Sequence, residues 1–267
     1  MPEGHTIHRA ARDQRPMLVG RTIAVASPQG RFAAGAASLD GRVCTAIEAY
    51  GKHLLYDFEG EQSLHVHLGL FGSFRSTAQP APAPRGAVRA RLTSSTHVVD
   101  IVGPNRCEVL DPAGKTALLA RIGPDVLRPD ADRTRAMDRI RASRTAVGLL
   151  LMDQSVIAGI GNIYRTELLW RAGIHPSSPG TRLSPAQVEH LWSDACDLLA
   201  RGVELGAIVT IDDATPGEGR YRERVNIFDQ PACPRCTRRI RMLVIGGRKA
   251  YACETCQKRP RRVTRTA

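Results

Sequence analysis

The first residues of the chain carry the apolar spacing of a helix. Ile7, Ala10 and Ala11 recur at intervals of three and four residues, as they would along one face of an α-helix. This spacing predicts a helix over residues 3–15. Pro16 is expected to end it, because proline lacks the backbone N–H that continues the helical ladder.

From about residue 20 to residue 111 the pattern changes to short apolar stretches punctuated by Gly, Pro and Asp. This texture is typical of strands in a sandwich or barrel. The predicted strands cover residues 22–26, 42–50, 53–58, 63–68, 87–93 and 97–101. The proline-rich residues 78–84 are expected to form a surface loop, since strand-like texture resumes directly after them.

Helical spacing returns between about residues 133 and 206. One helix start is well marked: Ser184 supplies an N-capping hydroxyl, Pro185 occupies the first helical position and Gln187 the third. We expect this helix to run from Pro185 to about Arg201. Upstream, the glycine-rich residues 158–162 lie between two apolar helical stretches, which predicts a tight turn between two helices.

These patterns predict an α+β multidomain protein. Residues 1–115 form an N-terminal helix and a β-sandwich, residues 125–220 a helical domain, and residues 226–260 a small cysteine-bearing module. No apolar run approaches the roughly 20 residues needed to span a bilayer, and the first residues lack the basic and apolar pattern of a secretory signal. We therefore expect a cytoplasmic protein without a membrane partner.

The positive charge of the chain is concentrated near its C-terminus. The net charge is +12, and residues 233–267 contain eleven Arg and Lys against one acid, Glu254. Such a segment is attracted to a polyanion, because binding releases condensed counterions. A solvated or disordered basic tail is the alternative interpretation.

Four of the seven cysteines form two evenly built pairs. Cys233 and Cys236 are separated by two residues, as are Cys253 and Cys256, and sixteen residues lie between the pairs. A β-hairpin of that length brings four thiolates around one tetrahedral Zn²⁺. Two disulfides are disfavoured without a secretion signal, and a redox pair would not need two such knuckles. The zinc is expected to be structural, because four thiolates leave no open position for catalysis.

Four motifs together resemble the formamidopyrimidine-DNA glycosylase and endonuclease VIII family, in order and over nearly the whole chain. Residues 1–4 resemble the endonuclease VIII branch, residues 51–55 the family's lysine-bearing strand, residues 153–164 its helix–two-turn–helix element, and the four-cysteine ribbon ending at Gln257 its zinc finger. The resemblance implies a bifunctional DNA glycosylase and AP lyase of base excision repair. It would act on damaged double-stranded DNA as a monomer, in a bacterial cytoplasm at the nucleoid.

Pro2 and Glu3 are the first candidate catalytic residues. Removal of Met1 exposes Pro2 as a secondary amine, and an α-amino group titrates near pH 8. The resemblance implies that this amine attacks the sugar C1′, releases the base and forms an iminium that drives β- and δ-elimination. Glu3 suits a general acid at the sugar ring oxygen. Taken alone, Pro2 could be a helix-start residue and Glu3 a carboxylate favoured by the helix dipole.

Three further residues match positions that hold DNA in the family. Lys52 resembles the catalytic lysine that contacts a phosphate near the lesion, although an isolated strand lysine is usually only solvated. Asn162, at a helix start, resembles the residue that grips a DNA phosphate. Arg248, at the turn of the zinc hairpin, resembles the zinc-finger arginine that does likewise on the lesion strand, and it is counted with Lys52 among the catalytic candidates. Tyr164 and Glu167 belong to the same motif as Asn162 but are expected to pack or to form local hydrogen bonds.

Residues 67–72 resemble the loop that fills the gap left by an extruded nucleotide. Leu70 is the expected wedge, with Phe71 as its partner. A core strand is the alternative, but Gly69 and Gly72 on either side fit an exposed loop better. His65 and His67 alternate in the preceding strand and suggest a metal site, which we reject because no third ligand accompanies them.

The sequence departs from the purine-directed members of the family in two places. Residues 103–107 lack the phenylalanine that purine-directed members carry after Asp-Pro, although Arg106 remains a candidate DNA contact. The segment between residues 205 and 221, which in purine-specific relatives includes a loop that closes over the flipped base, is short. Both departures favour oxidised pyrimidines as substrates, whereas His5, where the endonuclease VIII branch more often has Pro, does not. A purine-specific glycosylase and a non-catalytic zinc-ribbon protein that binds nucleic acid are the alternatives.

Overall fold

The computed structural model describes residues 2–211 and 221–260. The chain divides after Ile122 into two compact units. Within the described residues, no helix is both long and apolar enough to cross a membrane.

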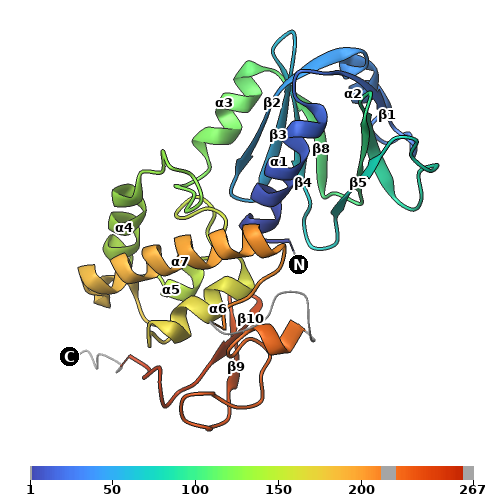
Figure 1. Cartoon of the computed structure of the whole chain (residues 1–267). Coiled ribbons are helices and arrows are strands. Elements are labelled where there is room, and N and C mark those ends of the chain that lie inside the picture. Colours follow the sequence, from blue (N-terminus) through green and yellow to red (C-terminus); the bar gives the residue numbers. More distant parts are fainter. Residues whose placement is uncertain (1, 212–220, 261–267) are drawn as a thin grey trace. The chain divides into compact units, whose positions relative to one another are not determined.

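The first unit is a β-sandwich that carries a helix at its N-terminus (Figure 1). Its sheet has the strand order β5-β7-β6-β1-β2-β3-β4-β8, and every pairing is antiparallel. β1 pairs with both β6 and β2 and so joins two four-stranded halves. The elements are α1 (Gly4–Leu18), β1 (Thr22–Ala26), α2 (Ala33–Leu39), β2 (Arg42–Tyr50), β3 (His53–Phe58), β4 (Gln62–His67), β5 (Ser73–Ala78), β6 (Val88–Thr93), β7 (His97–Val102), β8 (Arg106–Leu110) and α3 (Pro112–Ala120).

Alternating side chains explain why these strands enclose a core. In β6 every second residue is buried, as expected for a strand with one face toward the interior. Leu92 of β6 and Leu54 of β3 meet in one cluster with Ile7 of α1, and none of the three is more than 1% exposed. α1 therefore packs on the sheet through its apolar face, beside β2 and β3 (Figure 1).

The prediction that Pro16 ends the first helix is wrong. α1 continues through Pro16 to Leu18. A proline removes one hydrogen bond of the ladder, but Leu18 is fully buried in the core, and the Val19 N–H still donates to the Arg15 carbonyl at 3.0 Å. Packing of the last turn therefore outweighs the missing bond.

The six predicted strands are confirmed, with ends shifted by no more than one residue. Four elements were missed: α2, β5, β8 and α3. β5 is almost entirely exposed, so it lacks the apolar alternation that identifies a strand. The start of α3 did carry a signal, because Asp111 caps it, accepting from the Gly114 N–H at 2.7 Å, and Pro112 follows.

The second unit contains the helices and the cysteine hairpin. Its elements are α4 (Arg133–Ala142), α5 (Val147–Leu150), α6 (Asn162–Arg171), η1 (Gly180–Arg182), α7 (Pro185–Leu205), η2 (Tyr221–Arg224), β9 (Arg241–Ile245) and β10 (Arg248–Ala252). The capping box of α7 is confirmed: the Ser184 hydroxyl accepts from the Gln187 N–H at 3.2 Å, and the Gln187 side chain accepts from the Ser184 N–H at 2.9 Å. α7 runs one turn beyond the predicted end, to Leu205, and the following Gly206, with a φ of 68°, closes the helix.

β9 and β10 form the predicted hairpin. Ile245 pairs with Arg248, so only Gly246 and Gly247 make the turn. Their φ angles are 58° and 71°, and a two-residue turn with two positive φ values matches the twist of the strands. β10 lies against α6 within this unit (Figure 1).

Candidate active site and zinc centre

The N-terminal residues lie at the start of α1. Glu3 is the N-cap residue of this helix, with extended backbone, and its side chain is fully buried. Its carbonyl accepts from the Thr6 N–H at 2.9 Å. Pro2 is half-buried immediately before it, and Met1 lies outside the described residues.

Lys52 lies close to Pro2 in space. It occupies the turn between β2 and β3 rather than a strand, after Gly51 with a φ of 58°. A small cavity of about 10 Å³ is lined by Pro2, Ile7, Lys52, His67, Leu68 and Gly69. The fold therefore brings together the predicted nucleophile, the predicted lysine and the base of the 67–72 loop, which are far apart in the sequence.

His5 contributes no positive charge to this end of the molecule at neutral pH. Burial and, to a smaller extent, the positive charge of the chain terminus lower the pKa of His5 to about 4. The imidazole is 4% exposed. A neutral neighbour favours the uncharged form of an amine more than an imidazolium would.

Leu70 and Phe71 lie in an exposed turn between β4 and β5, which excludes the core-strand interpretation. Leu70 is 49% exposed and Phe71 is 93% exposed. Gly69 has a φ of 69°, and a Cβ on Gly72 would lie 2.5 Å from the Leu68 carbonyl oxygen. The turn therefore depends on both glycines.

Arg106 is the first residue of β8 and is paired with His67 of β4. Its side chain is 62% exposed, and Nη1 lies 3.7 Å from Oε1 of Glu108. A contact of that length between exposed groups holds the guanidinium only loosely. The side chain can therefore reorient toward another anion.

Arg165, a residue that the sequence did not single out, links Asn162 to the strand that carries Arg248. Arg165 is 1% exposed; it donates to Oδ1 of Asn162, to the Gly148 carbonyl at 3.2 Å and to the Lys249 carbonyl at 2.9 Å. Because a guanidinium can only donate, the oxygen of the Asn162 amide must face it, and the NH₂ group points elsewhere. Arg248, next to Lys249, is exposed.

Glu167 and Tyr164 behave as structural residues. The fully buried Glu167 carboxylate accepts from the Thr210 hydroxyl at 2.6 Å and from the backbone N–H groups of Asn226, Ile227 and Phe228 at 2.7 to 2.9 Å. The Tyr164 hydroxyl donates to the Leu198 carbonyl at 3.3 Å. Both side chains thus connect α6 to other segments of the second unit.

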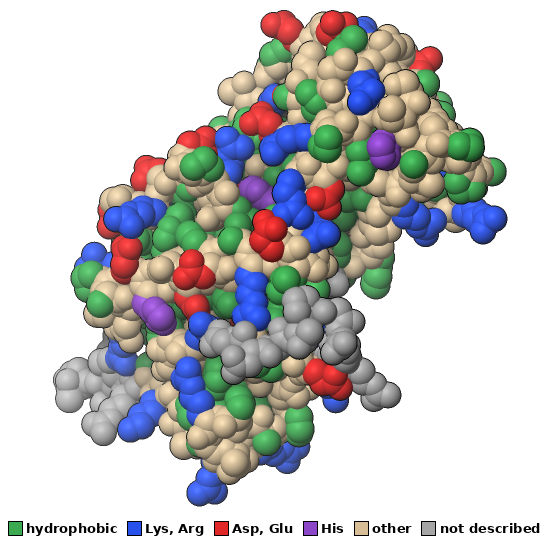
Figure 2. Space-filling model, viewed as in Figure 1, with side chains coloured by type: hydrophobic (Ala, Val, Ile, Leu, Met, Phe, Trp, Pro, Cys, Tyr) green, Lys and Arg blue, Asp and Glu red, His purple; other side chains and the backbone are tan. Residues whose placement is uncertain are grey.

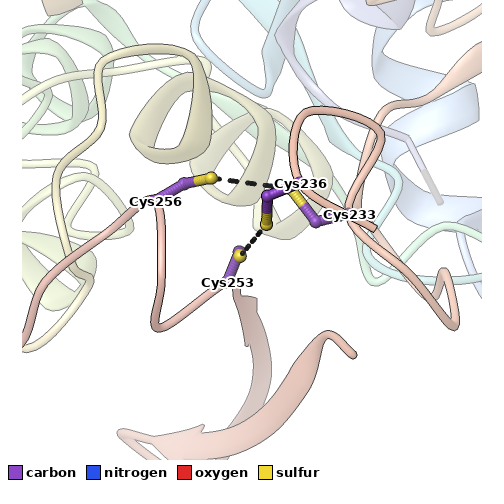
Figure 3. A group of neighbouring side chains, drawn as sticks. All are labelled: Cys233, Cys236, Cys253 and Cys256. Atoms are coloured by element: carbon purple, nitrogen blue, oxygen red, sulfur yellow. Dashed lines mark hydrogen bonds between the residues drawn. The ribbon is translucent and has the colours of Figure 1, made fainter. Parts of the chain in front are cut away.

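The four cysteines fit one zinc ion. Their Sγ atoms lie within 4.8 Å of one another, and Figure 3 shows them pointing toward a common centre. Sγ of Cys233 is 3.8 Å from that of Cys256, and Sγ of Cys236 is 3.4 Å from that of Cys253. A tetrahedral Zn²⁺ with bonds of about 2.3 Å places its sulfur ligands about 3.8 Å apart. The zinc of this module is structural, because the four thiolates fill its coordination shell.

Side chains outside the knuckles hold the zinc module on the end of α6. The Trp170 indole N–H donates to Sγ of Cys233 at 3.4 Å. The Gln257 side chain accepts from the Cys253 N–H at 2.9 Å and donates to the Ile174 carbonyl at 2.8 Å. Hydrogen bonds of this kind orient metal ligands.

Basic side chains are distributed widely on the surface. Figure 2 shows Lys and Arg side chains spread over the face in view, with acidic side chains between them. Of the basic C-terminal segment, residues 261–267 lie outside the described residues, as do residues 212–220 of the segment expected to be short.

Three family models match the chain in sequence order. Residues 1–107 match the formamidopyrimidine-DNA glycosylase N-terminal domain, residues 122–213 the formamidopyrimidine-DNA glycosylase H2TH domain, and residues 231–259 a zinc finger found in FPG and IleRS.

Two curated relatives are similar over almost their full length. Endonuclease 8 1 of Mycobacterium tuberculosis is 40% identical, with 96% of this chain and all of the relative covered. The formamidopyrimidine-DNA glycosylase of Chloroflexus aurantiacus is 33% identical, covering 96% of this chain and 98% of the relative.

The fold also matches a solved structure. The Lactococcus lactis formamidopyrimidine-DNA glycosylase bound to DNA with an AP site superposes with a TM-score of 0.80, covering 97% of this chain and all of that one. Its sequence identity is 21%, so this likeness bears on the fold alone.

Proposed function

Because the chain belongs to the formamidopyrimidine-DNA glycosylase and endonuclease VIII family of base-excision-repair glycosylases, we propose that it is a bifunctional glycosylase and AP lyase acting through Pro2. The observation that carries the proposal is the small cavity shared by Pro2 and Lys52, beside the buried Glu3. A buried carboxyl group adjoining an N-terminal amine provides an acid and a nucleophile at one place.

The reaction proceeds through a covalent intermediate. The Pro2 nitrogen attacks C1′ of the damaged nucleotide, the bond from C1′ to the base breaks, and the base leaves with a proton. Glu3 protonates the ring oxygen as the sugar opens, and the Pro2 nitrogen and C1′ form an iminium. Loss of a proton from C2′ expels the 3′ phosphate, and a second elimination expels the 5′ phosphate. Hydrolysis of the iminium restores the amine.

A secondary amine suits this sequence of steps. Its condensation product has no N–H to lose, so it stays a cation and withdraws electrons from C2′ through both eliminations. The attacking amine must be uncharged, and the neutral state of His5, whose pKa is about 4, avoids a second positive charge near it.

Each unit carries groups that can contact DNA. Asn162 at the start of α6 and the exposed Arg248 and Arg106 supply donors for phosphates. Lys52 places an ammonium beside Pro2, where it would contact the phosphate next to the lesion. Leu70 and Phe71 fill the space of the nucleotide that leaves the stack, which offsets part of an unstacking cost of a few kcal/mol.

The damaged base is proposed to be an oxidised pyrimidine. Residues 103–107 lack the void-filling phenylalanine of purine-directed members, and the 40% identity to an endonuclease 8 exceeds the 33% to a formamidopyrimidine-DNA glycosylase. Because the chain is also 33% identical to a formamidopyrimidine-DNA glycosylase, a purine-specific glycosylase is the alternative. Comparing the rates of cleavage of duplexes with thymine glycol and with 8-oxoguanine separates the two.

Borohydride trapping on an oligonucleotide with one abasic site tests the mechanism. We expect a covalent adduct that mass mapping places on the Pro2 nitrogen. Lys52→Ala is the matched control, because it removes the nearest predicted lysine amine and leaves the terminal amine in place. An adduct on a lysine, or no adduct from zinc-loaded protein that binds DNA, would overturn the lyase proposal and favour a binding module.

A further inference from the structure

Three neighbouring strands place a row of histidines and a glutamate on one face of the sheet. The β3–β4 register pairs His53 with His67, and the β4–β8 register pairs His65 with Glu108. Residues two apart on a strand share a face, so His65 and His67 point the same way, opposite to the buried Leu64 and Val66.

Two hydrogen bonds connect His53, His65 and Glu108 into a hydrogen-bonded relay. Nδ1 of His53 lies 2.8 Å from Nε2 of His65, and Nδ1 of His65 lies 3.0 Å from Oε1 of Glu108. The His65 side chain is 1% exposed, whereas that of Glu108 is 43% exposed. The relay therefore leads from a carboxylate at the surface through a buried imidazole to His53.

The carboxylate of Glu108 fixes which nitrogen donates in each hydrogen bond of the relay. A carboxylate only accepts, so His65 must donate from Nδ1, and a neutral His65 then accepts at Nε2. His53 must in turn donate from Nδ1, which leaves the lone pair of a neutral His53 on Nε2. The same logic orients the histidine of a serine hydrolase through its buried aspartate.

The His53 end of the relay adjoins the candidate active site. His53 follows Lys52 in sequence, and its ring centroid lies 4.9 Å from that of His67. His67 lines the cavity with Pro2 and Lys52. The proton state of this row therefore changes the charge at the edge of the site.

In the absence of DNA the row is uncharged at neutral pH. Burial, the other two histidines and the cations Arg121 and Arg106 lower the pKa of His53 to about 3. Burial also lowers the pKa of His65, against the opposing effect of Glu108. Burial, His65, Lys52 and Arg106 lower that of His67.

The other carboxylates near this row, Glu48 and Asp57, already have partners. On β2, Tyr50 pairs with His53 and its hydroxyl donates to Glu48 at 3.2 Å. Lys115 of α3 lies 3.9 Å from Glu48 and 2.7 Å from Asp57. Glu108 is therefore the carboxylate that can compensate a charge on the histidines.

We propose that Glu108 and His65 are positioning residues that hold His53 beside the Pro2 site and stabilise one proton taken up by the histidine row when a DNA phosphodiester binds there. The proton comes from solvent and bonds to Nε2 of His53. The phosphodiester offsets the positive charge of Lys52 and Arg106, which adds to burial in disfavouring the charged form of the row, while Glu108 stabilises the imidazolium through His65. The inference rests on the proposed function, because DNA is the ligand.

Glu108→Gln tests the proposal on the full-length, zinc-loaded protein. A Gln oxygen still accepts from His65 Nδ1, so the geometry is kept while the charge is lost. The ligand is a duplex carrying a tetrahydrofuran abasic analogue, which cannot form the iminium. Calorimetry in two buffers of different ionisation enthalpy counts the protons taken up on binding, and anisotropy gives Kd between about pH 8 and about pH 6.

We expect the wild type to take up about one proton near pH 6, with a Kd that tightens by up to about tenfold per pH unit. Glu108→Gln should lose most of this uptake. His53→Asn, which keeps a donor toward His65 but cannot take a proton, should lose it too. Glu59→Gln, which removes an exposed carboxylate on the turn between β3 and β4, should behave as the wild type.

Unchanged proton uptake in both Glu108→Gln and His53→Asn would overturn the relay, as would a wild type that takes up no proton. Borohydride trapping near pH 7 on a true abasic site distinguishes this failure from failure of the proposed function. Trapping on Pro2 without linked proton uptake refutes the relay alone. Absence of both DNA binding and trapping refutes the function on which the relay depends.

Discussion

Phe71→Ala should slow extrusion of the damaged nucleotide and leave the other steps of the reaction nearly unchanged. The phenyl ring is 93% exposed in the protein alone, so its removal leaves no cavity in the core. Almost the whole ring remains to be buried when it enters DNA. Burying a phenylalanine side chain contributes about 2 kcal/mol, and loss of that amount from the transition state slows the reaction by about thirtyfold.

The assay compares single-turnover excision of thymine glycol from duplex DNA with strand cleavage at an abasic site in single-stranded DNA, where no nucleotide leaves a stack. We expect the large loss on the duplex and less than about a threefold change on the single strand. Leu70→Ala should cost less, because its side chain is only 49% exposed and offers less area for burial. Equal losses on both substrates, or a lower melting temperature, would refute the wedge role.

Three further outcomes follow from buried groups. Glu167→Gln turns an NH₂ group toward N–H or O–H donors of residues 210 and 226–228, so it should lower the free energy of unfolding, measured in urea, by about 2 to 4 kcal/mol. The control Glu189→Gln, on the exposed side of α7, should change that free energy by less than about 0.5 kcal/mol. Equal effects of the two variants would contradict this account. Glu3→Gln should abolish base excision in a gel assay while DNA binding persists, and an active variant would exclude Glu3 as the acid. Lowering the pH from about 6.5 to about 4 should destabilise the protein, because buried histidines such as His5, whose pKa is about 4, stay neutral when folded but take up a proton when unfolded. Thermal melts of His5→Gln should show a smaller loss across this window, and an identical profile would rule out a contribution from His5.

Features encoded by short-range patterns could be predicted from the sequence. The two cysteine pairs, the Ser184 capping box and the six strands each depend on residues within a few positions of one another. The helix start at Asp111 also carried such a signal.

Features that depend on distant pairing could not be predicted. His65 meets Glu108 across 43 positions, through a register that only the folded sheet defines. Arg165 is buried by segments on either side of it, including the hairpin 84 positions away, and no local pattern distinguishes it from a surface arginine. The exposed strand β5 lacks any apolar period, because neither of its faces is buried.

The two ends of α6 perform different tasks. The helix begins at Asn162, which is proposed to meet a phosphate, and reaches Trp170, whose indole donates to a zinc thiolate. Arg165, in the first turn of α6, also donates to the Lys249 carbonyl of the hairpin, so apoprotein in a preparation would lose alignment at both ends of this helix and not only at the hairpin. Turnover measured per mole of bound zinc, rather than per mole of polypeptide, should then be the same from one preparation to the next.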